Sequence, residues 1–170
     1  MVAVLLFASV VQPAAALSEA EQQRLDLIRS SCSSIKLQLY KTQKSDSKTR
    51  VRIGAYYETI STKMMMNLNL RLVKNNIAAT SLATEQSDFS VKSEEFKRDF
   101  IKYSQELEGL IAIDCAKRPE DFSKKLDKVR KKRARLSQSV DELNVLIDEH
   151  RESVAALKED LFGAQEIENE

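Results

Sequence analysis

The feature that most constrains this chain is a repeat of apolar residues, at alternating steps of four and three, between Phe122 and Leu161. Ten of its twelve positions are apolar, which predicts one long helix with a coiled-coil seam. Pro119 suits the first position of a helix, so this helix is expected to begin there. The repeat comprises Phe122, Leu126, Val129, Arg133, Leu136, Val140, Leu143, Ile147, His150, Val154, Leu157 and Leu161.

Three further helices are predicted before Pro119. Only three glycines and two prolines occur in 170 residues, which favours few, long elements. We expect helices over 18–44 and 48–83, joined by a turn at Ser45-Asp46-Ser47, and a third that begins at Ser87 or Asp88 and ends near Cys115. The third is expected to bury one stripe, formed by Phe89, Phe96, Phe100, Tyr103, Leu107 and Leu110. The second is apolar around much of its circumference, which predicts a central position. The fold expected is all-α, an elongated antiparallel bundle of three to four long helices with coiled-coil character.

The N-terminal segment has the pattern of a signal peptide. Its first 18 residues carry no charged side chain, and an apolar run leads to Pro13 and Ala14-Ala15-Ala16. We expect cleavage after Ala16, a bundle domain over 17–162 and a disordered acidic tail over 163–170. The alternative is an uncleaved membrane anchor, although the run is shorter than a spanning helix needs. No Lys or Arg precedes the run, which departs from the usual signal pattern.

The two cysteines, Cys32 and Cys115, are predicted to form one disulfide. Two spaced thiols in an exported chain are typical of a structural bridge, and helices of the expected lengths bring both sulfurs to one level. The alternative is a pair of buried free thiols. His150 is the only histidine, so the cysteines do not indicate a metal site, and nothing in the sequence indicates a cofactor.

Two stretches resemble a known group of proteins. One is RVRIGAYYETISTKMMMNLNLRLVKNN, residues 50–76, and the other is IDCAKRPEDF, residues 113–122, taken with SCSSIKLQL, residues 31–39. Together they are similar to uncharacterised secreted helical-bundle proteins of ultrasmall, Saccharibacteria-type bacteria. The resemblance would cover most of the chain after the signal segment. It implies export and paired cysteines, and it carries no assigned activity and no catalytic residue.

A basic patch is predicted at the start of the last helix. The net charge of the chain is only +1, yet the segment from Lys117 to Arg135 holds ten basic and three acidic residues. In an exported protein such a patch would suit anionic lipid headgroups, cell-wall polymers or extracellular DNA. The alternative is a solvated face balanced by acids on neighbouring helices. The candidate residues are Lys124, Lys125, Lys128, Lys131, Lys132 and Arg135.

Polar residues along the apolar second helix are a second candidate site. If that helix is central, they must be hydrogen-bonded, either as a layer that fixes the register of the bundle or around a small ligand. The candidates are Arg52, Glu58, Asn67 and Arg71.

No catalytic motif occurs in the sequence, so we expect no enzyme. There is no glycine-rich phosphate loop, no serine elbow and no histidine-carboxylate pair at catalytic spacing. The leading hypothesis is an exported structural or interaction protein of the cell envelope. It would bind a protein or an anionic envelope polymer through its helix faces, or form a homo-oligomer. Nucleic acid is not favoured, and a membrane would be met only through an uncleaved N-terminus. The alternatives are a sensor-like, ligand-binding bundle and a chaperone-like holdase.

Overall fold

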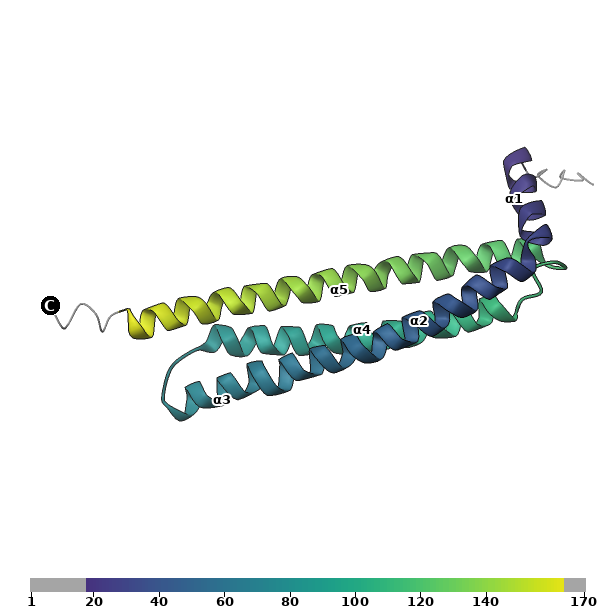
Figure 1. Cartoon of the computed structure of the whole chain (residues 1–170). Coiled ribbons are helices and arrows are strands. Elements are labelled where there is room, and N and C mark those ends of the chain that lie inside the picture. The colour runs from purple at the N-terminus through teal and green to yellow at the C-terminus, as the bar shows by residue number, and fades with distance from the viewer. Residues whose placement is uncertain (1–17, 164–170) are drawn as a thin grey trace, which may run out of the picture.

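The computed structural model describes residues 18–163 and confirms the all-α, elongated antiparallel bundle. Its elements are α1 (Glu19–Ser30), α2 (Cys32–Thr59), the π-helical segment η1 (Ile60–Met65), α3 (Met66–Lys74), α4 (Thr80–Ala112) and α5 (Pro119–Phe162). Because α2, η1 and α3 follow one another without a break, the bundle consists of three long arms, with α1 turned aside (Figure 1). No strand occurs between residues 18 and 163.

The first helix, α1, is capped at its start and braced on α5. The Ser18 hydroxyl accepts a hydrogen bond from the Glu21 backbone N–H at 3.3 Å, and the Glu21 carboxylate accepts one from the Ser18 N–H at 3.0 Å. At Ser31 the backbone leaves helical geometry, and α1 turns away from α2 to pack on α5. Arg24 of α1 pairs there with Asp127 of α5 at 2.8 Å. The buried residues of α1 are Leu25 and Ile28.

The predicted turn at Ser45-Asp46-Ser47 is wrong, because these residues lie within α2. Serine and aspartate favour caps when their side chains bond the local backbone. Here the Asp46 carboxylate instead accepts hydrogen bonds from Tyr103 of α4 and Arg133 of α5. A polar side chain that is paired across helices does not bond the local backbone, so it does not compete with the hydrogen bonds of the helix, and the helix continues.

The predicted break between residue 83 and Ser87 or Asp88 is also wrong, because the chain reverses earlier, at 75–79. Asn76 adopts a left-handed φ of 56° just after α3, and the Ile77 N–H bonds the Leu72 carbonyl at 2.9 Å. This geometry is a Schellman motif, in which asparagine takes the place usually held by glycine. The residues predicted as the next cap, Ser87 and Asp88, lie inside α4.

The central helix of the bundle is α4, so the predicted central position of the 48–83 helix is wrong. α4 packs against α5 on one side and against α2, η1 and α3 on the other. The first arm, which consists of α2, η1 and α3, buries only one stripe of side chains, and much of its apolar surface faces outward. The exposed apolar side chains of this arm between residues 50 and 74 are Val51, Tyr56, Met64, Met66, Leu70 and Val73.

The π-helical segment η1 keeps the buried stripe of the first arm facing α4. A π-helix closes i to i+5 hydrogen bonds, so its turn holds one residue more than an α-helical turn. The Met66 N–H bonds the Ser61 carbonyl in this way, and the buried stripe steps by five residues from Ile60 to Met65. Of the three consecutive methionines only Met65 is buried, at 2% exposure.

The core is a column of aromatic and aliphatic side chains along α4. Tyr57 of α2 meets Phe89 and Phe96 edge-on, with ring centroids 5.8 and 6.0 Å apart. The stripe predicted for this helix is confirmed, since Phe89, Phe96, Phe100, Tyr103, Leu107 and Leu110 are all buried. The seam predicted for the last helix is confirmed too, because all ten of its apolar residues are buried or half-buried.

The predicted pairing of Cys32 and Cys115 is confirmed, with their Cα atoms 5.5 Å apart. Cys32 begins α2, and Cys115 lies in the loop between α4 and α5. In the four-helix arrangement expected from the sequence, the two cysteines would lie on the first and third helices, which would run parallel; in the structure α2 and α4 run antiparallel (Figure 1). The bond therefore ties the start of the first arm to the loop that precedes α5.

The signal segment 1–16 and nearly all of the tail 163–170 lie outside the described residues, so both stay predictions. Within residues 18–163, none of the helices has the combination of length and apolarity that crossing a membrane requires.

Candidate functional site

The basic patch lies on the first half of α5, at the same end of the rod as the disulfide (Figure 1). Lys124, Lys128, Lys131 and Arg135 follow one another at steps of four, three and four, so they share one helix face. All four are exposed. The three lysines pair with no carboxylate among residues 18–163, whereas Arg135 pairs with Asp99 at 3.2 Å. The patch is thus a stripe that is only partly neutralised.

The other two predicted members of the patch, Lys125 and Lys132, are half-buried beside α4. Lys125 forms an ion pair with Glu106, with Nζ 2.5 Å from the carboxylate oxygen, and this contact holds the pKa of Glu106 below its usual value. The pKa of Asp99, the carboxylate that pairs with Arg135, is lowered first by Lys102 and then by Arg135. The expectation of a face balanced by neighbouring acids therefore holds for Lys125 and Arg135 but not for the outward lysines.

The described chain is divided in charge along its length. We call residues 18–50 and 98–137, around the disulfide, the positive half; they hold 19 Lys and Arg against 11 Asp and Glu, a net +8. Residues 51–97 and 138–163 form the negative half, with 8 Lys and Arg against 12 Asp and Glu, a net −4. The near-zero charge of the whole chain thus conceals a strongly dipolar rod.

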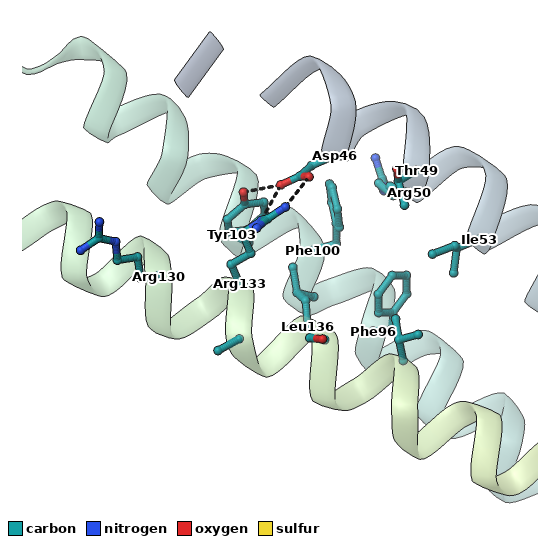
Figure 2. A pocket seen from close by; sticks show the side chains of 13 residues that line it. Asp46, Thr49, Arg50, Ile53, Phe96, Phe100, Tyr103, Arg130, Arg133 and Leu136 are labelled. Atoms are coloured by element: carbon teal, nitrogen blue, oxygen red, sulfur yellow. Dashed lines mark hydrogen bonds and ion pairs between the residues drawn. The ribbon is translucent and has the colours of Figure 1, made fainter. Parts of the chain in front are cut away.

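A polar cluster of Asp46, Tyr103 and Arg133 joins all three arms within the positive half (Figure 2). The Tyr103 hydroxyl donates to Asp46 at 2.6 Å, and the Arg133 guanidinium donates to both carboxylate oxygens at 3.0 and 3.1 Å. Burial, followed by the Asp46 carboxylate, raises the pKa of Tyr103 well above its usual value. The hydrogen bond to Asp46 likewise raises the pKa of Arg133. The cluster is a structural clasp between α2, α4 and α5.

A second cluster ties α4 to α5 in the negative half. Glu85 accepts a hydrogen bond from the Ser153 hydroxyl at 2.7 Å, and its other oxygen lies 2.9 Å from Nδ1 of His150. His150 is only 7% exposed, so this seam histidine is packed between α4 and α5. No partner for His150 could be predicted from the sequence, because the break expected between the second and third helices left Glu85 outside any helix.

The predicted polar layer is wrong. Its members, Arg52, Glu58, Asn67 and Arg71, are all exposed, so they neither join helices nor enclose a ligand. The physical reason is that the first arm lies at the side of the bundle rather than at its centre, and its polar residues simply face solvent. The interhelical polar contacts come from other positions, among them Asp46 and Glu85.

A groove of about 520 Å³ lies between α2 and α5, over the face of α4 (Figure 2). Phe96 and Phe100 of α4 form its floor, while Ile53 of α2 and Leu136 and Val140 of α5 form its apolar walls. The Asp46–Tyr103–Arg133 cluster lies beside the apolar part and bridges the two walls. The guanidinium of Arg50 lies 5.4 Å from the centroid of the Phe100 ring, a cation–π contact.

Among residues 18–163, no group of His, Cys, Asp or Glu side chains has the arrangement that holds a metal ion. No protein-family model, curated protein or solved structure matches this chain. A function for this chain must therefore be proposed from its own geometry.

Proposed function

We propose that this protein is an exported, non-enzymatic helical scaffold that binds an anionic polymer of the cell envelope through its positive half. The observation that carries the proposal is the charge division: 19 basic against 11 acidic residues around the disulfide, with three outward lysines that pair with no carboxylate in 18–163. A cationic face of this kind attracts polyanions and raises their rate of association.

Two features support export. The paired cysteines suit an oxidising compartment, because disulfides persist outside the cytosol. The apolar run that ends in Ala14-Ala15-Ala16 has the pattern of a cleaved signal. An envelope polymer is a partner that such a protein would meet after export.

A polymer with a charged backbone fits the stripe better than single-stranded nucleic acid. Proteins that bind single strands stack bases on aromatic side chains. The one aromatic residue close to the patch in sequence, Phe122, is fully buried and offers no stacking face. Lys124, Lys128 and Lys131 offer charge alone, which suits repeated phosphate or carboxylate groups.

A charge-reversal experiment tests the proposal. In the first variant Lys124, Lys128 and Lys131 are each changed to Glu; the matched variant changes three exposed cations of the negative half, Lys63, Arg71 and Lys74, to Glu. Both variants have the same net charge. We expect binding to poly(glycerol phosphate), measured at low and physiological salt, to weaken at least about tenfold in the first variant and little in the second. Equal losses in both would mean that only net charge matters, and no loss in the first would refute the proposal.

A further inference from the structure

The groove between α2 and α5 has the size and lining of a small-molecule site. Its volume of about 520 Å³ lies within the range of ligand pockets in proteins, roughly 300–1,000 Å³. Phe96, Phe100, Ile53, Leu136 and Val140 give it an apolar floor and walls. The groove stays open because α2 and α5 both pack on α4 and meet each other mainly through the Asp46–Arg133 pair.

The charges at the groove select an anion. Three arginines line it, Arg50, Arg130 and Arg133, against one carboxylate, Asp46. Within residues 18–163, Arg50 pairs with no carboxylate, and the only partner of Arg130 is Asp127 at 3.8 Å. Arg133 spends two of its N–H groups on Asp46, and a guanidinium has five. Arg130 lies on the far side of the Asp46–Tyr103–Arg133 cluster from the apolar part (Figure 2), so Arg50 is the cation that remains available to an anionic group there.

The shape of the groove favours a single flexible chain over a peptide helix. The Asp46–Tyr103–Arg133 cluster reaches from α2 to α5 and closes one end of the apolar part (Figure 2). A helix that ran along the groove would have to displace this cluster and leave three hydrogen-bonding groups without partners. A chain with one charged head stops against the cluster, with its head at Arg50 and its apolar tail directed towards Ile53 and Val140.

We propose that this groove binds a long-chain fatty acid, one molecule per protein, with the carboxylate beside Arg50 and the alkyl chain over Phe96 and Phe100. The site is separate from the lysine stripe on the outer face of α5, so it does not depend on polymer binding. Burial of the alkyl chain supplies most of the affinity, and Arg50 supplies selectivity for the anion.

A fluorescence titration of the full chain with dansyl-labelled undecanoate tests the site, below the concentration at which the probe forms micelles. We expect saturable binding at one probe per chain, with displacement by dodecanoate at least about tenfold stronger than by dodecanol or dodecyltrimethylammonium. Non-saturable binding, or equal displacement by the three competitors, would overturn the proposal.

Two pairs of variants locate the site. Ser137→Trp fills the groove from an exposed lining position, and its matched control, Gln138→Trp, lies on the same helix outside the groove. Arg50→Gln removes the head contact, and its control is the exposed Arg52→Gln. We expect Ser137→Trp to abolish binding, Arg50→Gln to weaken it about tenfold and both controls to leave it unchanged. Similar losses in the controls would overturn the proposal. So would a fall in native mass in Ser137→Trp alone, which would assign the groove to a second copy of the chain.

Discussion

The two halves of this rod are built from the same kinds of helix but are held together differently. In the positive half a disulfide and the Asp46–Tyr103–Arg133 cluster connect all three arms. In the negative half, Glu85 connects α4 to α5 through His150 and Ser153, and a separate Ser61–Ser90 hydrogen bond of 2.7 Å connects η1 to α4. There α3 leaves Leu70 and Val73 exposed at 61% and 73%. The positive half is therefore held by a covalent bridge and by one cluster that joins all three arms, whereas the negative half is held by separate links between pairs of helices.

Removal of the disulfide is expected to have the largest effect on this contrast. A bridge between residues 83 apart contributes about 4 kcal/mol to stability in the chain-entropy model. A Cys32→Ala, Cys115→Ala double variant should therefore lose about 4 kcal/mol of unfolding free energy in a urea titration. Reduction of the unaltered chain should give a similar loss and no change in the double variant. An unchanged midpoint after reduction would show that the bridge does not brace this end.

Substitution of Asp46 is the next largest test. Asp46→Ala leaves the Arg133 guanidinium and the buried Tyr103 hydroxyl without their shared acceptor. We expect the free energy of unfolding to fall by about 2 kcal/mol. A buried polar group without a hydrogen-bond partner costs more than a single hydrogen bond contributes to stability. Ser45→Ala is the matched control at an exposed position of α2 and should change stability little. Equal stability in both variants would mean that the cluster does not join the arms.

The stability of the chain should fall at alkaline pH, chiefly through Tyr103 of the positive half. The pKa of Tyr103 is raised in the folded chain, so above pH of about 10 the unfolded chain releases a proton that the folded chain keeps. Unfolding is then favoured as pH rises. Tyr103→Phe should lower the melting temperature at neutral pH but flatten its decline above pH of about 10, with Tyr57 accounting for a remainder because its pKa is also raised. The exposed Tyr56→Phe serves as control, and an equal decline in both variants would contradict this cause.

The smallest effect expected is a gain in stability when Gly54 is replaced by alanine. A Cβ built there would meet nothing within 4 Å, so alanine fits the middle of α2 without strain. Gly54→Ala should stabilise the chain by about 0.5–1 kcal/mol through helix propensity. Gly109→Ala is the comparison, because its Cβ would lie 3.3 Å from Cε of Lys125, the partner of Glu106. A larger gain at Gly109 than at Gly54 would contradict this packing.

The heptad seam made α5 predictable almost to the residue, and the aromatic stripe did the same for the buried face of α4. The prediction for the first arm was wrong because the cap preferences of Ser45-Asp46-Ser47 favour a turn. The stripe Leu39, Thr42, Asp46, Thr49, Ile53 crosses this segment at unbroken steps of three and four and would have indicated one helix. The turn at Asn76 was missed because asparagine, not glycine, supplies the left-handed residue.

The candidate site was predictable only in part, for a related reason. A run of lysines is visible in sequence, so the stripe on α5 was found. Hydrogen-bond partners on other helices can be predicted only if the central helix is known. The apolar circumference of 48–83 indicated that this helix is central, whereas α4 holds that position. The sequence around Asp46 and Glu85 therefore predicts a turn and a loop, and the groove between α2 and α5 has no signal in any single segment.

Hydrogen exchange measured by mass spectrometry, with and without inorganic polyphosphate, tests the contrast between the halves most directly. In the free protein we expect the helical amides around Tyr103 and Arg133 to exchange slowest and those of α3 to exchange faster. Saturating polyphosphate should slow exchange around Lys124, Lys128 and Lys131 and leave α3 unchanged. Uniform exchange along the rod, or protection by polyphosphate centred on the negative half, would contradict the account.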